Sequence, residues 1–341
     1  MKVDLKSLDL VETEVWAEEL GLKPYRAQQI RHWLFKGLAS SFDEMTNLSK
    51  ELRARLREQA FINPLEAVKT EVSGDGTRKY LFKLWDENFI ESVLIPERGH
   101  STLCISSQAG CAMGCRFCLT ARQGLKRNLT PSEIIDQVIQ IKRGMANPDG
   151  LTNLVFMGMG EPLANYDAVI KALRNLISEE GVNFSHRKVT LSTCGLIPQM
   201  RRLGRDISVN LAVSLNAADD ETRTLLMPVN RRYSLEPLIS ECKAFPLPNR
   251  RMITFEYILI SGINDRDRDA RKLADLLSGL RAKINLIPLN ANPGLDMAPP
   301  SMDRVLRFQD ILIRANYTAI IRKSKGQDIS AACGQLSGSF S

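Results

Sequence analysis

The feature that most constrains the fold is a regular alternation of strand and helix over residues 98–316. Apolar segments predict strands, and each of them is followed by a helical stretch. The expected strands cover residues 102–107, 153–157, 188–192, 208–215, 252–260 and 283–288. Six such units predict an α/β fold with a partial (β/α)6, TIM-like barrel, in which functional loops lie at the carboxyl ends of the strands.

Two smaller segments precede the barrel. Residues 1–62 place apolar and charged side chains at helical spacing, which predicts a small helical domain. Residues 63–97 contain two strand-like stretches, 74–85 and 89–95, that flank turn-forming residues. We therefore expect a β-hairpin linker, which places Glu91 on a strand near the barrel entrance.

The last segment, residues 317–341, combines one more strand with a flexible region. The apolar run over 317–323 predicts the strand. Residues 326–334 contain turn-forming glycines, so we expect a flexible segment there, and it carries Cys333.

Composition narrows the partner and the location. The chain of 341 residues has 46 Lys and Arg against 39 Asp and Glu, a net charge of +7, which favours an anionic partner. No apolar run has the length of a membrane span, and the first residues of the chain lack the apolar core of a secretion signal. We therefore expect a cytoplasmic protein that does not associate with a membrane. Basic residues of the helical domain form either a phosphate-contacting face or ordinary solvated surfaces: Arg26, Arg31, Lys36, Lys50, Arg53, Arg55 and Arg57.

Three cysteines in the motif Cys111-Ala-Met-Gly-Cys115-Arg-Phe-Cys118 indicate a metal centre. Thiolates at these spacings can bind three irons of a [4Fe-4S] cluster and leave the fourth iron open to another ligand. The alternative is a zinc site that takes Cys104 or a distant cysteine as its fourth ligand. Seven cysteines in a chain that is not secreted favour ligands or catalytic groups over a disulfide framework.

The residues around this motif place it on a loop between a strand and a helix. The apolar stretch 102–107 predicts a buried strand before it. After it, Thr130 suits a helix N-cap and Glu133 stands three positions later, so a capping box begins a helix over 131–139.

The Cys-x3-Cys-x2-Cys spacing resembles the cluster loop of radical S-adenosylmethionine enzymes, in which the cofactor occupies the open iron. Further motifs extend the resemblance over nearly the whole chain: Met157-Gly-Met-Gly-Glu-Pro-Leu163, Leu191-Ser-Thr-Cys-Gly195, Ile284-Asn-Leu-Ile-Pro-Leu-Asn290 and Ala331-Ala-Cys-Gly-Gln-Leu336. With the pair Cys104 and Cys333, they resemble the RlmN-type adenine-C2 RNA methyltransferases. The resemblance implies one [4Fe-4S] cluster on Cys111, Cys115 and Cys118, with S-adenosylmethionine as cofactor.

The resemblance implies a radical route, because carbon 2 of adenine lies between two ring nitrogens and is a poor nucleophile. One S-adenosylmethionine methylates the Cys333 sulfur, and a second is cleaved to a 5′-deoxyadenosyl radical that takes a hydrogen from the S-methyl group. The carbon radical adds to the ring, and Cys104 resolves the protein–RNA adduct through a transient disulfide. Either Glu91 or Cys104 removes the ring proton.

The resemblance also implies cofactor contacts from loops after the barrel strands. The expected residues are Gly160, Glu161, Ser192, Ser214, Leu215, Asn216 and Asn290. A carboxylate at Glu161 suits the ammonium group of the methionine moiety. Two positions depart from the family pattern: Asn216 replaces the usual His, and Cys194 stands where Ser is common. We expect Cys194 and Cys242 to be packed core residues.

The partners implied are 23S ribosomal RNA, transfer RNA and an electron donor such as a flavodoxin-type reductant. The target base must leave its stack to reach a barrel mouth, so we expect base flipping. Basic groups along the chain either contact phosphate or are ordinary surface residues: Arg201-Arg202, Arg231-Arg232, Arg250-Arg251 and Arg322-Lys-Ser-Lys325. The alternative functions are a Cfr-type methyltransferase acting at carbon 8 and a non-catalytic, zinc-stabilised RNA-binding protein.

Overall fold

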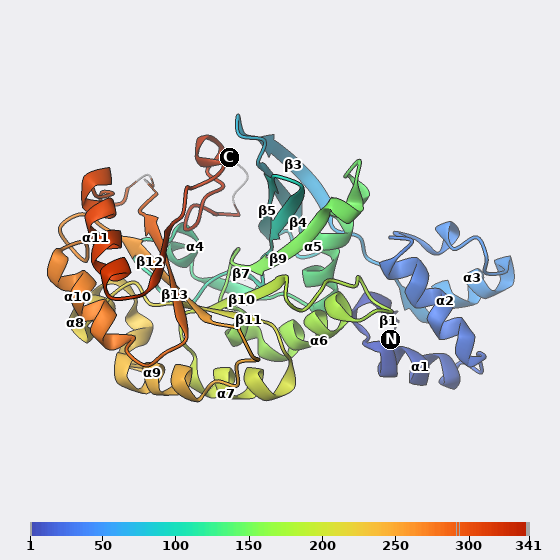
Figure 1. Ribbon diagram of the computed structural model, residues 1–341. Helices are drawn as coiled ribbons and strands as arrows, with labels where there is room; N and C mark the ends of the chain where they lie inside the picture. The colour runs from blue at the N-terminus through green and yellow to red at the C-terminus, as the bar shows by residue number, and fades with distance from the viewer. Residues whose placement is uncertain (1, 291, 293, 339–341) are drawn as a thin grey trace.

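The structure is a computed structural model that describes residues 2–290, 292 and 294–338. Within these residues, one ten-stranded sheet has the order β14-β13-β12-β11-β10-β9-β6-β5-β4-β3 (Figure 1). Its parallel part consists of β6 (His100–Cys104), β9 (Leu151–Phe156), β10 (Val189–Thr193), β11 (Asn210–Ser214), β12 (Ile253–Leu259), β13 (Ala282–Pro288) and β14 (Thr318–Ile321). All six barrel strands expected from the sequence are present, and the strand expected near residue 320 joins them as the parallel edge strand.

Helices cover the outer face of the parallel strands, as a partial barrel requires (Figure 1). They are α5 (Pro131–Arg143), α6 (Tyr166–Ile177), α7 (Ile197–Asp206), α8 (Asp220–Leu226), α9 (Leu235–Ala244), α10 (Asp267–Leu276) and α11 (Met302–Arg314). Helix α5 begins with the predicted capping box: Glu133 N donates to Thr130 Oγ1 at 3.2 Å, and Thr130 N donates to Glu133 Oε2 at 2.9 Å.

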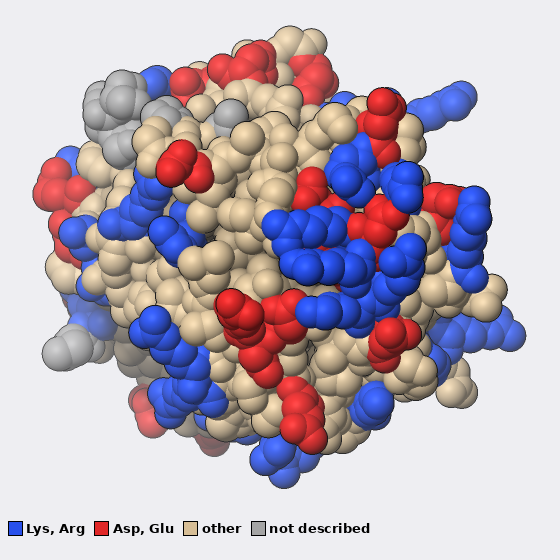
Figure 2. Space-filling view, turned by 90° about the vertical axis from the view of Figure 1, so that its left-hand side faces the viewer, with Lys and Arg blue, Asp and Glu red and all other residues tan. Residues whose placement is uncertain are grey.

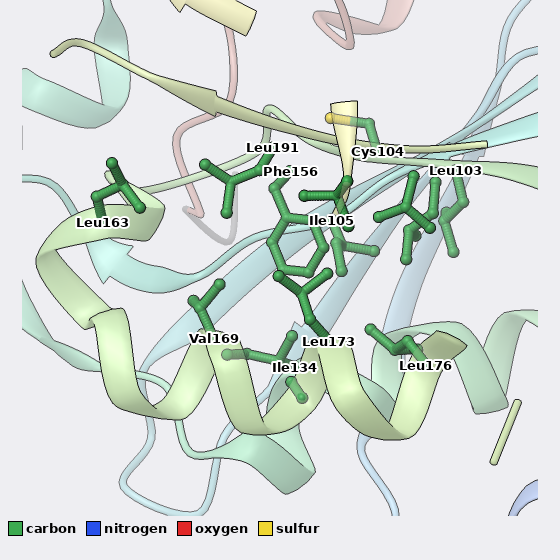
Figure 3. Close-up of a cluster of buried hydrophobic side chains, with 14 of the residues drawn as sticks. Leu103, Cys104, Ile105, Ile134, Phe156, Leu163, Val169, Leu173, Leu176 and Leu191 are labelled. Carbon is green, nitrogen blue, oxygen red and sulfur yellow. The ribbon is translucent and has the colours of Figure 1, made fainter. Parts of the chain in front are cut away.

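The hydrophobic core lies between the strands and these helices. Leu103 and Phe156 on the strands belong to the same buried cluster as Ile134 of α5 and Leu173 of α6 (Figure 3). Each is at most 1% exposed, so each contributes about 1.5–3 kcal/mol by leaving water. Cys104, next to Leu103, points its sulfur away from α6 (Figure 3), because neighbouring side chains of a strand face opposite sides.

Residues 63–97 differ from the predicted hairpin. They form three antiparallel strands, β3 (Glu66–Val72), β4 (Arg78–Lys83) and β5 (Phe89–Glu97), and β5 pairs with β6. The segment therefore extends the barrel sheet. Strand β3 was missed because its sequence, Glu-Ala-Val-Lys-Thr-Glu-Val, has no buried residue, and so it lacks the alternation of apolar and polar positions that a half-buried strand shows.

The N-terminal helical region packs against the barrel. It contains α1 (Leu10–Glu19), α2 (Pro24–Phe35), α3 (Lys50–Gln59) and the paired strands β1 (Val3–Asp4) and β2 (Ala60–Phe61). Lys6 and Asp136 of α5 form an ion pair in which both side chains are fully buried. Arg31 is 1% exposed and donates to Asn175 Oδ1 of α6 at 2.8 Å. Arg31 therefore belongs neither to a phosphate-contacting face nor to a solvated surface, so both alternatives are wrong for this residue.

Short 3-10 helices connect several of these elements: η1 (Leu5–Ser7), η2 (Phe42–Glu44), η3 (Pro148–Gly150), η4 (Pro162–Asn165), η5 (Pro228–Arg231) and η6 (Gln327–Ile329). In the part of the chain that the structure describes, we find no helix with the length and apolar character needed to cross a membrane.

Candidate active site

The cysteine motif lies on a loop that leaves strand β6 through β7 (Gln108–Gly110) and continues into α4 (Leu119–Arg122) and β8 (Leu125–Asn128). Strands β7 and β8 pair with each other and close the base of the loop. Cys111 N donates to Gly124 O at 3.0 Å. Gly110 has φ +76°, and a Cβ there would lie 1.9 Å from Gly124 O, so only glycine fits the crossing.

One cavity collects most of the predicted site residues from the ends of several strands. The predicted residues that line it are Cys111, Cys115, Cys118, Gly160, Glu161, Ser192, Ser214, Asn216 and Cys333. They come from the cysteine loop, from the ends of β9, β10 and β11, and from the C-terminal segment. Four predicted residues do not line the cavity: Glu91, Cys104, Leu215 and Asn290. Leu215 is fully buried.

Glu161 places a buried carboxylate in the cavity wall. Its Oε2 accepts from Cys194 N at 2.8 Å and its Oε1 accepts from Leu163 N at 3.0 Å. Burial raises the pKa of this carboxyl above its usual range, although the two backbone donors oppose the shift. Gly160 has φ +98°, and a Cβ there would lie 2.5 Å from Cβ of Gln108, so glycine is required beside the cysteine loop.

The two positions that depart from the family pattern both lie in the wall of the cavity. Asn216 has φ +59° and accepts from Ile258 N through its Oδ1 at 2.8 Å, so its side chain joins the ends of β11 and β12. Asparagine tolerates this left-handed backbone better than most residues. Cys194 is buried and lines the cavity, whereas Cys242 is buried in α9 away from it.

Sequence reasoning missed Arg223 of α8, which is fully buried behind the cavity. Its guanidinium donates to the backbone oxygens of Cys194 at 2.7 Å and Leu215 at 3.2 Å. It also donates to Asn230 Oδ1 at 2.8 Å. Arg223 thereby fixes the loops after β10 and β11. Charged residues are common in amphipathic helices, so the sequence around Arg223 does not indicate that its side chain is buried.

Glu256 of β12 was also missed, although it lines the cavity and is only 8% exposed. Its Oε1 accepts from Asn285 Nδ2 at 2.9 Å, and burial raises its pKa above the usual range. A signal was available here, because an acidic residue in the middle of an apolar strand must be paired or functional.

The C-terminal segment is held over the cavity by side chains of other elements. Asn290 Nδ2 donates to Cys333 O at 3.1 Å, and Asn292 Nδ2 donates to Gly334 O at 3.1 Å. Thr120 Oγ1 donates to Leu336 O at 2.7 Å. Cys333 is an exposed residue that lines the cavity. Desolvation of its thiol by the surrounding protein, with a smaller effect of Glu256, raises the pKa of Cys333 to about 11.

Glu91 and Cys104 lie on the paired antiparallel strands β5 and β6. Cys104 is buried at the end of β6, and this burial, with a smaller effect of the nearby Cys333, raises the pKa of its thiol. Glu91 Oε2 accepts from the backbone N of Ser337 at 2.7 Å and of Gly338 at 2.8 Å. All seven cysteines lie within the described residues and all are free. The transient disulfide expected between Cys104 and Cys333 is not supported by this structure, in which both thiols are free.

The donor set of the cavity includes the three cysteines of the motif. Among the described residues, no group of three or more His, Cys, Asp or Glu side chains is placed to hold a single metal ion. A cubane cluster takes one thiolate per iron, so its three cysteines need not converge on a point. Burial raises the pKa of Cys111 to about 12, so metal binding there must displace a proton.

Comparison with known proteins decides the family. The model of the ribosomal RNA large subunit methyltransferase N-terminal domain matches residues 3–62, and the radical SAM superfamily model matches residues 105–274. The dual-specificity RNA methyltransferase RlmN of Syntrophus aciditrophicus is 51% identical over 337 residues, which cover 99% of this chain and 97% of that protein. This chain belongs to the RlmN family.

Other RlmN-family comparisons agree in sequence and in structure. The RlmN protein of Geobacter sulfurreducens is 52% identical over 336 residues, 98% of this chain and 92% of that protein. A crystal structure of a radical SAM methyltransferase from Sphaerobacter thermophilus has a TM-score of 0.94 and 45% identity, and the match covers 99% of this chain and all of that one. These findings confirm the predicted family, the α/β fold and the class of radical SAM methyltransferases. They argue against the alternative function of a non-catalytic, zinc-stabilised RNA-binding protein.

Proposed function

We propose that this RlmN-family enzyme methylates carbon 2 of adenosine in 23S ribosomal RNA and in transfer RNA, and that the methyl group passes through Cys333. The observation that carries the proposal is the cavity itself, where the three motif cysteines meet the C-terminal Cys333. The relatives are named dual-specificity RNA methyltransferases, which supports two RNA substrates.

Residues of the cavity would hold a [4Fe-4S] cluster and S-adenosylmethionine. Cys111, Cys115 and Cys118 would bind the cluster. Glu161 would face the ammonium group of the methionine moiety, because a buried carboxylate needs a positive partner. The polar groups of Ser192, Ser214 and Asn216 would contact the rest of the cofactor, and Asn290 would act through the backbone of Cys333. When bound, the two groups supply the methyl groups and the electron of a radical methylation.

The protein's own groups position the reacting sulfur. Asn290 and Asn292 hold the carbonyls of Cys333 and Gly334, so the Cys333 side chain is directed into the cavity. The buried Cys104 lies near Cys333 and would help to release the RNA adduct. Glu91 would accept the ring proton only after the C-terminal segment moves, because the Ser337 and Gly338 amides now occupy its Oε2. A flavodoxin-type protein would deliver the electron.

The test compares the protein with Cys118→Ala after purification without oxygen. We expect about four irons per chain and a brown colour in the unmodified protein, and a loss of both in the variant. The matched control is Cys242→Ala, because Cys242 is buried in α9 and does not line the cavity. Stoichiometric zinc without colour, or full iron in Cys118→Ala, would contradict the proposed cysteine ligands.

A further inference from the structure

A second concave surface lies on the outside of the barrel, at the start of α10 and α11. Arginines dominate its described lining, which consists of Arg266, Arg268, Arg271, Arg304 and Arg307 together with Asp267, Asp303 and Ser301. We call this surface the arginine groove. Figure 2 views the side of the molecule that carries α10 and α11, and it shows a broad patch of Lys and Arg side chains with acidic residues between them.

The groove opens on the same rim of the barrel as the active-site cavity. Helix α10 follows β12 and helix α11 follows β13, so both helices begin at the carboxyl ends of those strands. Ile258 of β12 and Ile287 of β13 line the cavity near the same ends. A long partner that places one group in the cavity can therefore extend over this rim to the groove.

An aspartate arranges the arginines of the groove. Asp267 accepts from Arg304 Nη1 at 2.8 Å and lies 2.6 Å from Arg307 Nη2, so two guanidinium groups from α11 are held beside the first turn of α10. Arg268 and Arg271 are exposed, and the side chain of Arg268 has 65% of its surface accessible. The positive charge of the groove thus exceeds its negative charge and faces solvent.

This arrangement favours phosphate over other anions and over apolar partners. A guanidinium group presents a planar fork of donors that matches phosphate oxygens. The first turns of two helices also point here, and helix N-termini carry partial positive charge. Several arginines spread over two helices suit a row of phosphates better than one small anion.

We propose that the arginine groove binds the sugar-phosphate backbone of the substrate RNA outside the nucleotide that is methylated. This inference rests on the proposed function, because it assigns a docking surface to the same RNA. Contacts of this kind position the substrate without reading its sequence. The groove therefore contributes to affinity and to the KM for RNA and leaves kcat unchanged.

The test measures binding of an unmodified transfer RNA transcript to the double variant Arg268→Gln/Arg271→Gln, which leaves the Asp267 ion pairs intact. The control is Arg187→Gln/Arg205→Gln, which removes the same charge from exposed residues at the opposite end of the barrel. Binding is followed over about 0.05–0.2 M salt, where each phosphate contact contributes about 1 to the slope of log K against log salt. We expect the slope of the groove variant to fall by about 2 and its affinity to fall on the order of tenfold or more at low salt.

The outcomes separate this inference from the proposed function, because binding is measured without any methyl transfer. A groove variant that matches the control in affinity and slope would overturn the docking surface, even where the unmodified protein methylates RNA. If the protein binds RNA through the groove but forms no methyladenosine, the docking surface is supported and the proposed methylation is contradicted. If thermal unfolding shows that the double variant is misfolded, Arg271→Gln alone is measured, with an expected slope change of about 1.

Discussion

At the scale of single residues, the position of Glu91 bears on two properties of the site: how the C-terminal segment is held and which group accepts the ring proton. Its side chain is 3% exposed, and its Oε1 lies 3.2 Å from Lys79 Nζ. Its Oε2 accepts from the two backbone amides of Ser337 and Gly338. The carboxylate therefore anchors the C-terminal segment. Cys333 lies on the same segment, four residues before Ser337. The same carboxylate is our candidate acceptor of the ring proton, so Oε2 would have to release the two amides before it accepts that proton.

The anchoring role predicts the effect of Glu91→Gln on the C-terminal segment. The uncharged amide makes weaker hydrogen bonds to the two backbone donors, so we expect a loss of about 1–3 kcal/mol in unfolding free energy and faster proteolysis after residue 326. Urea unfolding and timed proteolysis measure these effects. Glu71→Gln is the control, because Glu71 also pairs with Lys79 and does not contact the segment. Equal proteolysis of both variants would argue against the anchor.

At the scale of elements, Arg127 of β8 connects the cysteine loop to the turn between β4 and β5 and to helix α5. Its guanidinium donates to Asp86 Oδ2 at 2.6 Å, in the turn between β4 and β5, and to Glu133 Oε1 of α5 at 2.7 Å. Its carbon Cζ also lies 5.2 Å from the ring centroid of Trp85. Arg127 thus fixes the base of the cysteine loop to the turn between β4 and β5, 41 residues earlier, and to the start of α5, six residues later.

This connection predicts a pH-dependent stability. The hydrogen bond from Arg127 is the main reason that the pKa of Asp86 is lowered to about 2. Because the folded value lies below the ordinary aspartate value of about 3.9, the stabilisation is present above about pH 4 and is lost as the pH falls through about 2. We expect Asp86→Asn to cost about 0.5–1 kcal/mol near pH 7, a small value because the pair is partly exposed.

Urea unfolding of the two proteins between about pH 5 and about pH 3 checks this expectation. The difference in unfolding free energy should narrow toward the acidic end. A difference that stays constant over this range would show that Asp86 does not stabilise the fold through its charge.

The same elements show what sequence could predict. Apolar strands with helices between them have a strong periodic pattern, so β9 to β13 and the capping box of α5 were predictable from local residues. Strand β3 has no buried side, and the short β7 and β8 depend on the loop that they close, so none of them has a local pattern. Arg31 and Arg223 are charged residues inside helices, and only the tertiary contacts show that they are buried.

At the scale of the whole molecule, the N-terminal helices and the C-terminal segment are both held in place by contacts with residues far away in the sequence. The buried pair of Lys6 and Asp136 and the hydrogen bond from Arg31 to Asn175 fix the N-terminal helices on α5 and α6. The C-terminal segment returns over the opposite side of the sheet, where Asp328 accepts from Ser73 Oγ at 2.6 Å. A cavity covered by an anchored C-terminal segment suits a reaction in which Cys333 of that segment carries the methyl group.

The central claim is that the methyl group reaches carbon 2 of adenosine as a radical carried by Cys333. The most direct measurement incubates the protein, iron-loaded without oxygen, with an unmodified transfer RNA transcript, a reductant and S-adenosylmethionine whose methyl group is CD3. The RNA is then digested, and its nucleosides are analysed by mass spectrometry against 2-methyladenosine and 8-methyladenosine standards. The account predicts 2-methyladenosine with a CD2H group, because one deuterium is lost when the S-methyl group becomes a radical and a proton replaces it when the bond to sulfur breaks. A CD3 group, the 8-methyl isomer, or product from Cys333→Ala would contradict it.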